Sequence, residues 1–247
     1  MRSFFSALRF LTLFPVPSSW CGDKDNLRKS LFSFPLIGLV IGGIVAGIGF
    51  GLGHVLPALP ASVFVVVALV AASRGLHLDG LADTADGFFS SRSRERILEI
   101  MRDSRTGAMG VVAIATVLLL KVSLLAAAGG PLEWGLVLLM PLAGRCALLV
   151  VTAFFPYARP EGGLATVFRG GRGRLALLAL WACVVLFAAG WLIESRKGLA
   201  AAGASIAVAL LFGVYSWRKV GGYTGDTLGA TCEIVELVPA LVYATWA

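Results

Sequence analysis

Three aspartates stand close together in a chain that carries little charge. The segment LHLDGLADTADG, residues 76–87, contains Asp79, Asp83 and Asp86, although only 14% of the 247 residues are charged. On a helix each residue turns by about 100°, so the three side chains share one face within an arc of roughly 60°. Carboxylates this close repel one another, and a bound proton or a divalent cation must offset that repulsion. Because Mg²⁺ prefers oxygen ligands and shares them with substrate phosphates, the spacing predicts magnesium-assisted displacement at phosphorus.

Two of these aspartates also have a simpler interpretation. Asp79 and Asp86 each precede a glycine, and Asp is common at helix N-caps and in turns. Three carboxylates on one face at a membrane boundary favour function instead, because acids near hydrocarbon are costly. His77 precedes the first aspartate, and it either packs structurally or contacts phosphate and moves a proton. The candidate catalytic residues are therefore His77, Asp83 and Asp86.

A strongly charged segment follows the aspartates. SRSRERILEIMRDSRTGAMG, residues 91–110, begins as an amphipathic helix with a solvated face. Asp103 is the candidate fourth metal ligand, after Asp79, Asp83 and Asp86. Arg102 and Arg105 are candidate phosphate ligands, because a guanidinium fork matches phosphate oxygens.

Two further segments supply candidate substrate-binding residues. GGYTGDTLGATCEIVE, residues 221–236, combines glycines that free backbone N–H groups with Thr224, Asp226 and Glu233. YARPEGGLATVFRGGRGR, residues 157–174, offers Arg159 beside glycines. The alternative for this arginine is an ordinary basic residue of a cytoplasmic loop.

Membrane helices must position these residues. The chain is 58% hydrophobic with mean hydropathy +0.87, which exceeds the range of soluble domains. Its formal net charge of +7 is spread between apolar runs, so membrane topology explains it better than binding of nucleic acid. The four cysteines are far apart, which gives no metal-site spacing. We predict an all-α polytopic bundle that forms one catalytic domain, residues 1–247, with an Asp-rich cytoplasmic segment over 77–107.

Seven apolar segments are long enough to span a bilayer, with six as the alternative if the last is re-entrant. They cover residues 34–56, 58–78, 108–128, 134–155, 175–193, 199–217 and 227–247. Lys121 and Arg145 interrupt two of these segments, and each needs a partner, either the acidic cluster or backbone carbonyls. Residues 1–17 are interrupted by Arg9 and end at prolines, which predicts a short helix in the membrane interface.

The distribution of basic residues predicts the orientation. With the N-terminus in the cytoplasm, nearly all Lys and Arg outside the spans lie on the inner side, and Arg196 and Lys197 alone lie outside. The same arrangement brings the acids of residues 79–103 and 226–236 to the cytoplasmic face. We therefore expect the active site at the inner face of a bacterial cytoplasmic membrane.

Several of these motifs resemble those of the cobalamin synthase family, the adenosylcobinamide-GDP ribazoletransferases. LHLDGLADTADG, SRERILEIMRDSRTGAMG and GGYTGDTLGATCEIVE carry the resemblance, together with LTLFPVP and SFPLIGLVIGG near the N-terminus. The resemblance implies a multipass inner-membrane enzyme that depends on Mg²⁺. It implies joining of adenosylcobinamide-GDP to α-ribazole, or to its 5′-phosphate, with release of GMP. Ala165 stands where that family usually has a glycine, which puts a backbone contact there in doubt.

The expected mechanism uses two Mg²⁺ ions held by Asp79, Asp83, Asp86 and Asp103, with Asp83 or Asp86 accepting the proton of the attacking ribose hydroxyl. Two other activities stay open as alternatives. A CDP-alcohol-type phosphotransferase also uses clustered aspartates, but Asp83 stands where its motif has Arg. An Asp-lined cation transporter would carry acids on both halves of its path, whereas here they gather on one side. The expected partners are the two substrates and the lipid bilayer, not nucleic acid, and a homo-oligomer is compatible with this interpretation.

Overall fold

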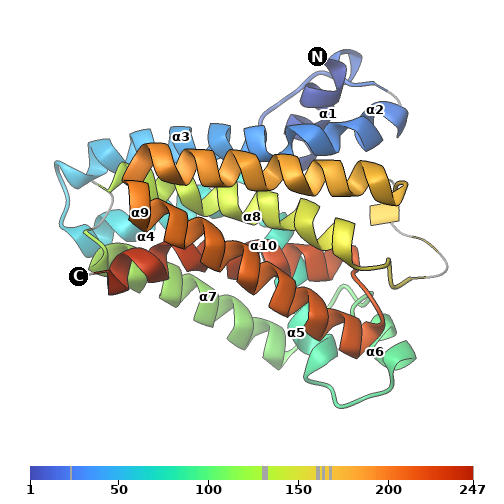
Figure 1. Ribbon diagram of the computed structural model, residues 1–247. Helices are drawn as coiled ribbons and strands as arrows, with labels where there is room; N and C mark the ends of the chain where they lie inside the picture. The colour runs from blue at the N-terminus through green and yellow to red at the C-terminus, as the bar shows by residue number, and fades with distance from the viewer. Residues whose placement is uncertain (23, 130–132, 160–161, 163–164, 167–168, 247) are drawn as a thin grey trace.

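The protein is a bundle of long helices, with the shorter helices gathered toward one end (Figure 1). The computed structural model describes residues 1–247 apart from 23, 130–132, 160–161, 163–164, 167–168 and 247. Within those described residues, the β pairing consists of an isolated bridge between Tyr157 and Tyr223, so the predicted all-α class is confirmed. The α-helices are α1 (Arg2–Leu11), α2 (Lys24–Lys29), α3 (Phe34–Gly53), α4 (Ala58–Ala72), α5 (Leu76–Phe88), α6 (Arg94–Ile100), α7 (Ala108–Ala127), α8 (Trp134–Phe154), α9 (Arg172–Val220) and α10 (Gly225–Thr245). Two 3₁₀ turns, η1 (Ser18–Trp20) and η2 (Ser30–Ser33), flank α2.

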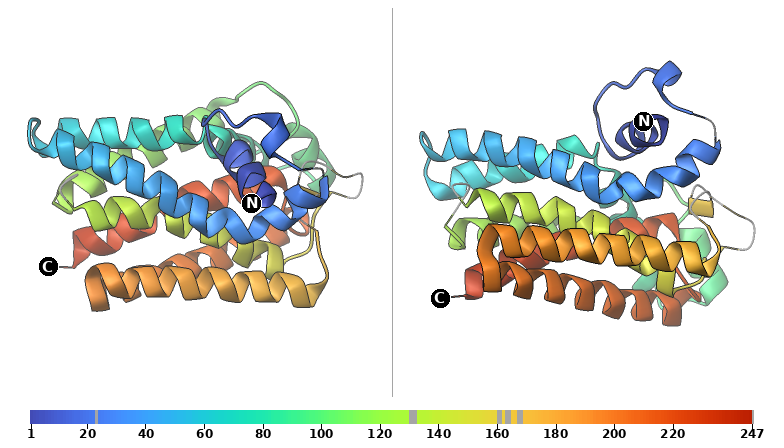
Figure 2. Two further views of the ribbon diagram at one scale, coloured as in Figure 1. Left: turned by 90° about the horizontal axis from the view of Figure 1, so that it is seen from above. Right: turned by 45° about the horizontal axis from the view of Figure 1, so that its top comes forward.

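Several of these helices are long and apolar enough to cross a membrane. Five described helices qualify by length and composition, and a sixth span is counted if α4 and α5 are one bent span. α9 is counted once, although its backbone leaves helical φ/ψ at Glu194 and Ser195 and its two arms run back along each other (Figure 2). A Cβ on Gly190 would lie 2.5 Å from the Gly198 carbonyl oxygen, so glycine lets the two arms meet. Each of the seven predicted segments overlaps a helix or one arm of α9, and how many cross a bilayer stays a prediction.

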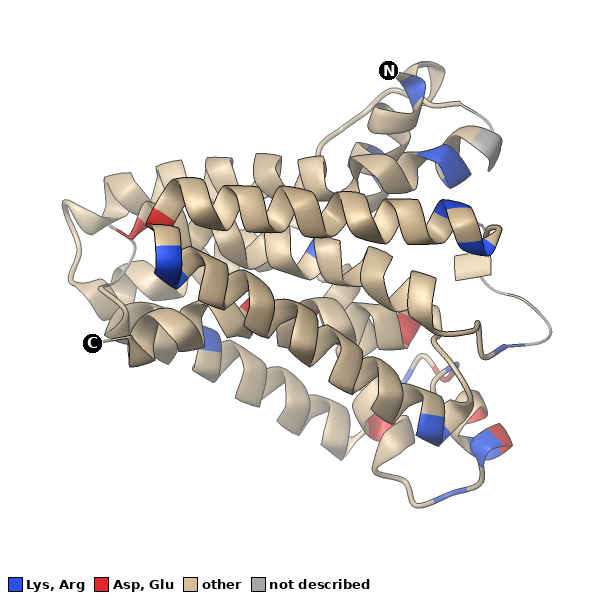
Figure 3. Ribbon diagram, viewed as in Figure 1, with Lys and Arg blue, Asp and Glu red and all other residues tan. Residues whose placement is uncertain are grey.

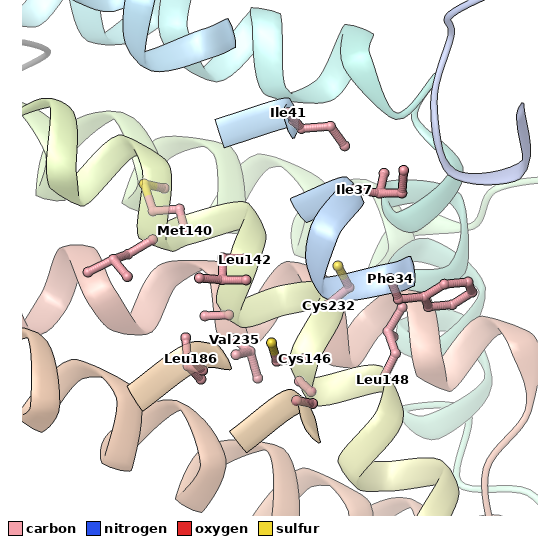
Figure 4. Close-up of a cluster of buried hydrophobic side chains, with 14 of the residues drawn as sticks. Phe34, Ile37, Ile41, Met140, Leu142, Cys146, Leu148, Leu186, Cys232 and Val235 are labelled. Carbon is pink, nitrogen blue, oxygen red and sulfur yellow. The ribbon is translucent and has the colours of Figure 1, made fainter. Parts of the chain in front are cut away.

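α8 forms the centre of the bundle. Its residues from Gly135 to Thr152, apart from Leu138, are buried, and it packs against α3, α9 and α10. Side chains such as Met140 and Leu186 fill the shared core (Figure 4). A Cβ on Gly42 of α3 would lie 2.6 Å from the carbonyl oxygen of Leu138, so the close approach of α3 to α8 requires glycine. Small residues at such crossings allow the tight packing that holds helices together in lipid.

The predicted span over residues 58–78 is wrong at its carboxyl end. α4 stops at Ala72, and the chain bends by 89° into α5. Arg74 and Gly75 have φ values of 54° and 68°, and the Gly75 N–H donates to the Val70 carbonyl, which closes α4 with a left-handed cap. The prediction missed this stop because apolar residues continue on both sides of it. α5 is 13 residues long, or ~20 Å, and it is not one of the five helices that qualify as spans by themselves.

Charged residues gather at the end of the bundle that carries α5, α6 and the N-terminal helices (Figure 3). α1 is a short helix, as the sequence predicts, and Arg74 ties it to the α4–α5 corner. The guanidinium of Arg74 donates to the carbonyls of Arg9 and Phe10 at 3.1 and 3.4 Å. Such an uneven distribution of charge is typical of a membrane protein whose basic residues lie on one side of the bilayer. That this side is cytoplasmic stays a prediction.

Candidate active site

A cavity of about 280 Å³ lies where residues of α1, α3, α5, α8 and α10 meet. Its polar lining comes from α5, α10, the carboxyl end of α8 and the connection that follows α8, and comprises His77, Asp79, Thr152, Tyr157, Arg159 and Asp226. The lining from α1, η2 and α3 is entirely apolar, and comprises Phe10, Leu11, Leu31 and Phe34. An apolar pocket with a few convergent polar groups is the usual form of a small-molecule site. Four predicted site residues therefore share one cavity: His77, Asp79, Arg159 and Asp226.

Two glycines bring α5 and α10 into contact beside this cavity. A Cβ on Gly80 would lie 2.8 Å from the carbonyl oxygen of Asp226, and one on Gly229 would lie 3.1 Å from the carbonyl oxygen of His77. Larger residues at either position would push the helices apart. The two glycines therefore explain how Asp79 on α5 and Asp226 on α10 come to line the same cavity.

The start of α10 is fixed by a capping box. The Thr224 hydroxyl accepts the Thr227 N–H at 3.1 Å, and the Thr227 hydroxyl accepts the Thr224 N–H at 2.8 Å. Arg159 donates to Asp226 Oδ2 at 2.6 Å, and both side chains are only partly exposed. The Thr224 hydroxyl also donates to this carboxylate, at 3.3 Å. The contacts of Thr224 position α10 and Asp226, and its predicted role in binding substrate stays a prediction.

Asp83 lies one turn beyond Asp79 on α5 and is half-buried. The pKa of Asp83 is raised from 3.8 to about 7, mainly by burial and in addition by the charges of Asp79, Asp226 and Asp86, against a lowering by Arg159. The repulsion predicted from the spacing is therefore present in the fold. The structure adds Asp226, from a helix far away in sequence, to the same group of carboxylates.

Asp86 caps a helix to which it does not belong. Its Oδ2 accepts the Gly107 N–H at 2.6 Å and its Oδ1 accepts the Gly110 N–H at 2.8 Å, at the start of α7. A carboxylate there satisfies N–H groups that lack helical partners and interacts favourably with the helix dipole. Asp86 therefore contacts a helix start, as the capping alternative predicts, but the helix that it caps is α7 and not the one that contains it. Its metal and proton-transfer roles stay predictions.

The remaining candidates of the charged segment lie outside the cavity lining. Asp103 and Arg105, between α6 and α7, pair with each other at 2.7 Å on the exposed surface. The hydrogen bonds from Arg105 lower the pKa of Asp103 to about 2. Arg102 is exposed on the same connection. These three residues were predicted as a metal ligand and phosphate ligands, and the structure does not bring them to the cavity.

Glu233 belongs to a buried ion network. Lys121 on α7 donates to Glu233 at 2.7 Å and to Glu236 at 2.5 Å, and Arg145 on α8 donates to Glu236. Each of these four side chains is at most 3% exposed. The two cations that interrupt predicted spans are thus neutralised by acids of α10, not by the aspartates of α5. Glu233, predicted to bind substrate, does not line the cavity.

His77 lies between the cavity and this network. It lines the cavity, and within the described residues its buried Nδ1 has no hydrogen-bond partner. Among the described residues, the buried Nε of Arg159 also has no hydrogen-bond partner. Buried polar atoms normally have partners, so both atoms are suited to hydrogen bonds with a ligand.

The aspartates suit Mg²⁺ only in combination with a substrate. Among the described residues, no group of three or more His, Cys, Asp and Glu side chains could hold a metal ion by itself. Mg²⁺ commonly binds through one or two carboxylates, waters and substrate phosphates and needs no closed cage of protein ligands. Asp79 and Asp83, crowded by Asp226, supply the hard, negatively charged oxygens that such an arrangement requires, so the residues present fit the ion.

Several cavity residues were not predicted. Tyr157 and Thr152 stand close to Arg159 in sequence, and Tyr157 is part of the same YAR segment, so that segment offered a signal for it. Phe10 and Phe34 lie in apolar stretches without any local mark of function, because their place in the cavity depends on how α1 and α3 pack.

Fold and site together define a multipass helix-bundle membrane protein with an acidic, arginine-containing cavity at its charged end. Within that class, the chain belongs to the cobalamin-5-phosphate synthase family, whose model matches residues 3–244. The segments around Asp79 and Asp226, which carry the predicted resemblance, supply His77, Asp79 and Asp226 to the polar lining of the cavity.

Curated relatives agree with this membership. A protein of Roseiflexus sp. (strain RS-1), named adenosylcobinamide-GDP ribazoletransferase, is 45% identical over 235 residues, which cover 94% of this chain and 85% of that protein. Proteins with the same name from Desulforamulus reducens and Herpetosiphon aurantiacus are each 40% identical, over 94% and 96% of this chain and 93% and 94% of their own lengths. No solved structure matches the chain.

Proposed function

We propose that this protein joins adenosylcobinamide-GDP to α-ribazole, or to its 5′-phosphate, to give adenosylcobalamin or its phosphate and GMP. The observation that carries the proposal is the cavity in which Asp79, Arg159 and Asp226 meet, because most of its lining comes from the segments that resemble the family. Relatives that share most of the chain carry the corresponding name. Three carboxylates and an arginine are also the groups that displacement at a diphosphate needs.

The residues have distinct roles in this reaction. The ribose hydroxyl of α-ribazole attacks the phosphorus that bears the cobinamide arm, the diphosphate bond breaks, and GMP leaves. Asp83 accepts the hydroxyl proton on the carboxylate oxygen that the metal ion leaves free, because a carboxylate positioned beside the attacking hydroxyl can act as a general base. Arg159, held by Asp226 at 2.6 Å, binds a phosphate oxygen through N–H groups that this ion pair does not use.

Magnesium completes the proposed site. Asp79 and Asp83 would hold the ion together with diphosphate oxygens, with Asp86 and Asp103 as the further predicted ligands. When bound, Mg²⁺ neutralises the diphosphate and stabilises the leaving GMP. We place the reaction at the cytoplasmic face of a bacterial inner membrane, because charged residues gather at the end of the bundle that carries α5 (Figure 3), and α5 residues line the cavity.

The test is transfer by purified protein in detergent, with both substrates and with Mg²⁺ varied. Asp83→Asn should lower turnover by about 100-fold or more, since a positioned base contributes ~10²–10⁴-fold. Glu99→Gln is the control, because Glu99 pairs with Arg96 on the exposed surface. Near-normal turnover of Asp83→Asn with an unchanged Mg²⁺ requirement would remove Asp83 from the site. Absence of product from the wild-type protein, with Mg²⁺ flux in proteoliposomes, would favour a transporter instead.

A further inference from the structure

We propose that the cavity holds the nucleoside substrate, with its fused aromatic base against the apolar wall and its ribose toward the polar wall. The corrinoid substrate stays outside and presents only its diphosphate to α5. This inference rests on the proposed function, because it assigns each of the two substrates of that reaction to a place in the fold.

The size of the cavity separates the two substrates. Its volume of about 280 Å³ lies at the lower end of pockets that enclose drug-sized ligands, ~300–1,000 Å³. A riboside of two fused rings belongs to that size class. A corrinoid macrocycle with an attached nucleotide is several times larger and cannot enter whole.

The apolar wall matches a flat base without polar edges. Phe10 and Leu11 of α1, Leu31 of η2 and Phe34 of α3 contribute it. Two of them are aromatic, and aromatic side chains pack well against flat rings. Because these elements lie outside the segments that carry the acids, the two walls are built independently, one for the base and one for the sugar.

The polar wall has hydrogen-bonding capacity that the described part of the chain leaves unused. His77 Nδ1 and Arg159 Nε are buried without partners within the described residues, and both residues line the cavity. A ribose supplies hydroxyl groups that can donate to the imidazole and accept from the guanidinium. Binding of the sugar there would give hydrogen-bond partners to His77 Nδ1 and Arg159 Nε. A buried polar atom without a partner is otherwise destabilising.

The same orientation brings the sugar to the chemistry. Asp79 lines the cavity, and Asp83 follows one turn later on α5, at a rise of ~6 Å. A ribose against the polar wall therefore has its hydroxyl groups beside the carboxylates. The diphosphate of the second substrate reaches Asp83 from the part of α5 beyond the cavity.

The wall also predicts which base is preferred. The residues from α1, η2 and α3 that line it offer apolar side chains, so a purine with a ring nitrogen and an amino group loses its water without replacement. A benzimidazole-type base, whose outer edge is carbon, loses nothing there. We therefore expect α-ribazole to bind at least about tenfold more tightly than the α-riboside of adenine.

One glycine allows a steric test. Among the residues that the structure describes, a Cβ on Gly225 would meet only the Cβ of Ala165 within 4 Å, at 4.0 Å, and both residues line the cavity. Gly225→Leu should therefore fill the cavity while leaving the fold intact. Gly47→Leu in α3 is the matched control, since an added Cβ there meets no described atom within 4 Å and Gly47 is not among the described residues that line the cavity.

The experiment is equilibrium dialysis of α-ribazole against the full-length protein in detergent, together with steady-state kinetics for both substrates. Gly225→Leu should weaken α-ribazole binding and raise its KM by about tenfold or more, with the KM for adenosylcobinamide-GDP changed less than about twofold. Gly47→Leu should match the wild type, and circular dichroism should show both variants folded.

Two results would overturn the assignment. One is Gly225→Leu affecting the KM for adenosylcobinamide-GDP and not that for α-ribazole, and the other is equal affinity for the benzimidazole and adenine ribosides. If Gly225→Leu does not fold, Ala165→Leu tests the same space from the opposite side. A wild-type protein that binds α-ribazole but forms no product with Mg²⁺ would refute the proposed function and leave the subsite standing.

Discussion

Replacing Lys121 by Met would leave two buried carboxylates facing a single guanidinium. The Lys121 side chain is 1% exposed, and its ammonium lies 2.7 Å from Glu233 and 2.5 Å from Glu236. Removing one partner of such a group leaves an uncompensated buried charge, which typically costs about 3–5 kcal/mol. We expect Lys121→Met to lower the free energy of unfolding by that amount, because the ion pairs between α7 and α10 are lost while the carboxylates of α10 stay buried.

The assay is unfolding in mixed micelles with increasing sodium dodecyl sulfate, followed by circular dichroism. Arg96→Met is the control, because the Arg96–Glu99 pair is more than half exposed and such pairs contribute less than about 1 kcal/mol. The double variant Lys121→Met with Glu233→Gln restores the charge balance and should recover a large part of the loss. A loss for Lys121→Met no greater than that of Arg96→Met would refute the reasoning.

Three further predictions concern α5. Asp86→Ala should destabilise the protein by about 1–2 kcal/mol and speed hydrogen exchange at the Gly107 and Gly110 amides, and unchanged exchange would contradict the capping role. Gly80→Leu should separate α5 from α10, because even a Cβ would lie 2.8 Å from the Asp226 carbonyl oxygen. Turnover should fall by ~100-fold. Activity equal to wild type would mean that the site does not need this close contact. The raised pKa of Asp83, about 7 against an ordinary 3.8, means that below pH ~7 Mg²⁺ must displace a proton, so the half-saturating Mg²⁺ concentration should rise by about tenfold per pH unit. A Mg²⁺ requirement that stays constant from pH ~7.5 to ~5.5 would rule out this competition.

The membrane bundle and the common face of the aspartates were predictable because both depend on neighbouring residues. An apolar run long enough to span is a property of consecutive residues. Helical periodicity alone places Asp79, Asp83 and Asp86 together, and the structure has all three on α5. The end of α4 was mispredicted because a left-handed stop at Gly75 has no effect on hydropathy.

Only the tertiary structure decided which distant groups meet. Lys121 finds Glu233 across 112 residues of sequence, Asp86 caps α7, and Phe10 joins Asp226 at one cavity. Each of these outcomes depends on how helices cross, and at Gly80 the crossing is so close that a Cβ would lie 2.8 Å from the Asp226 carbonyl oxygen. Sequence spacing determines which side chains share a face of one helix. Which other helix that face contacts depends on how side chains pack throughout the bundle.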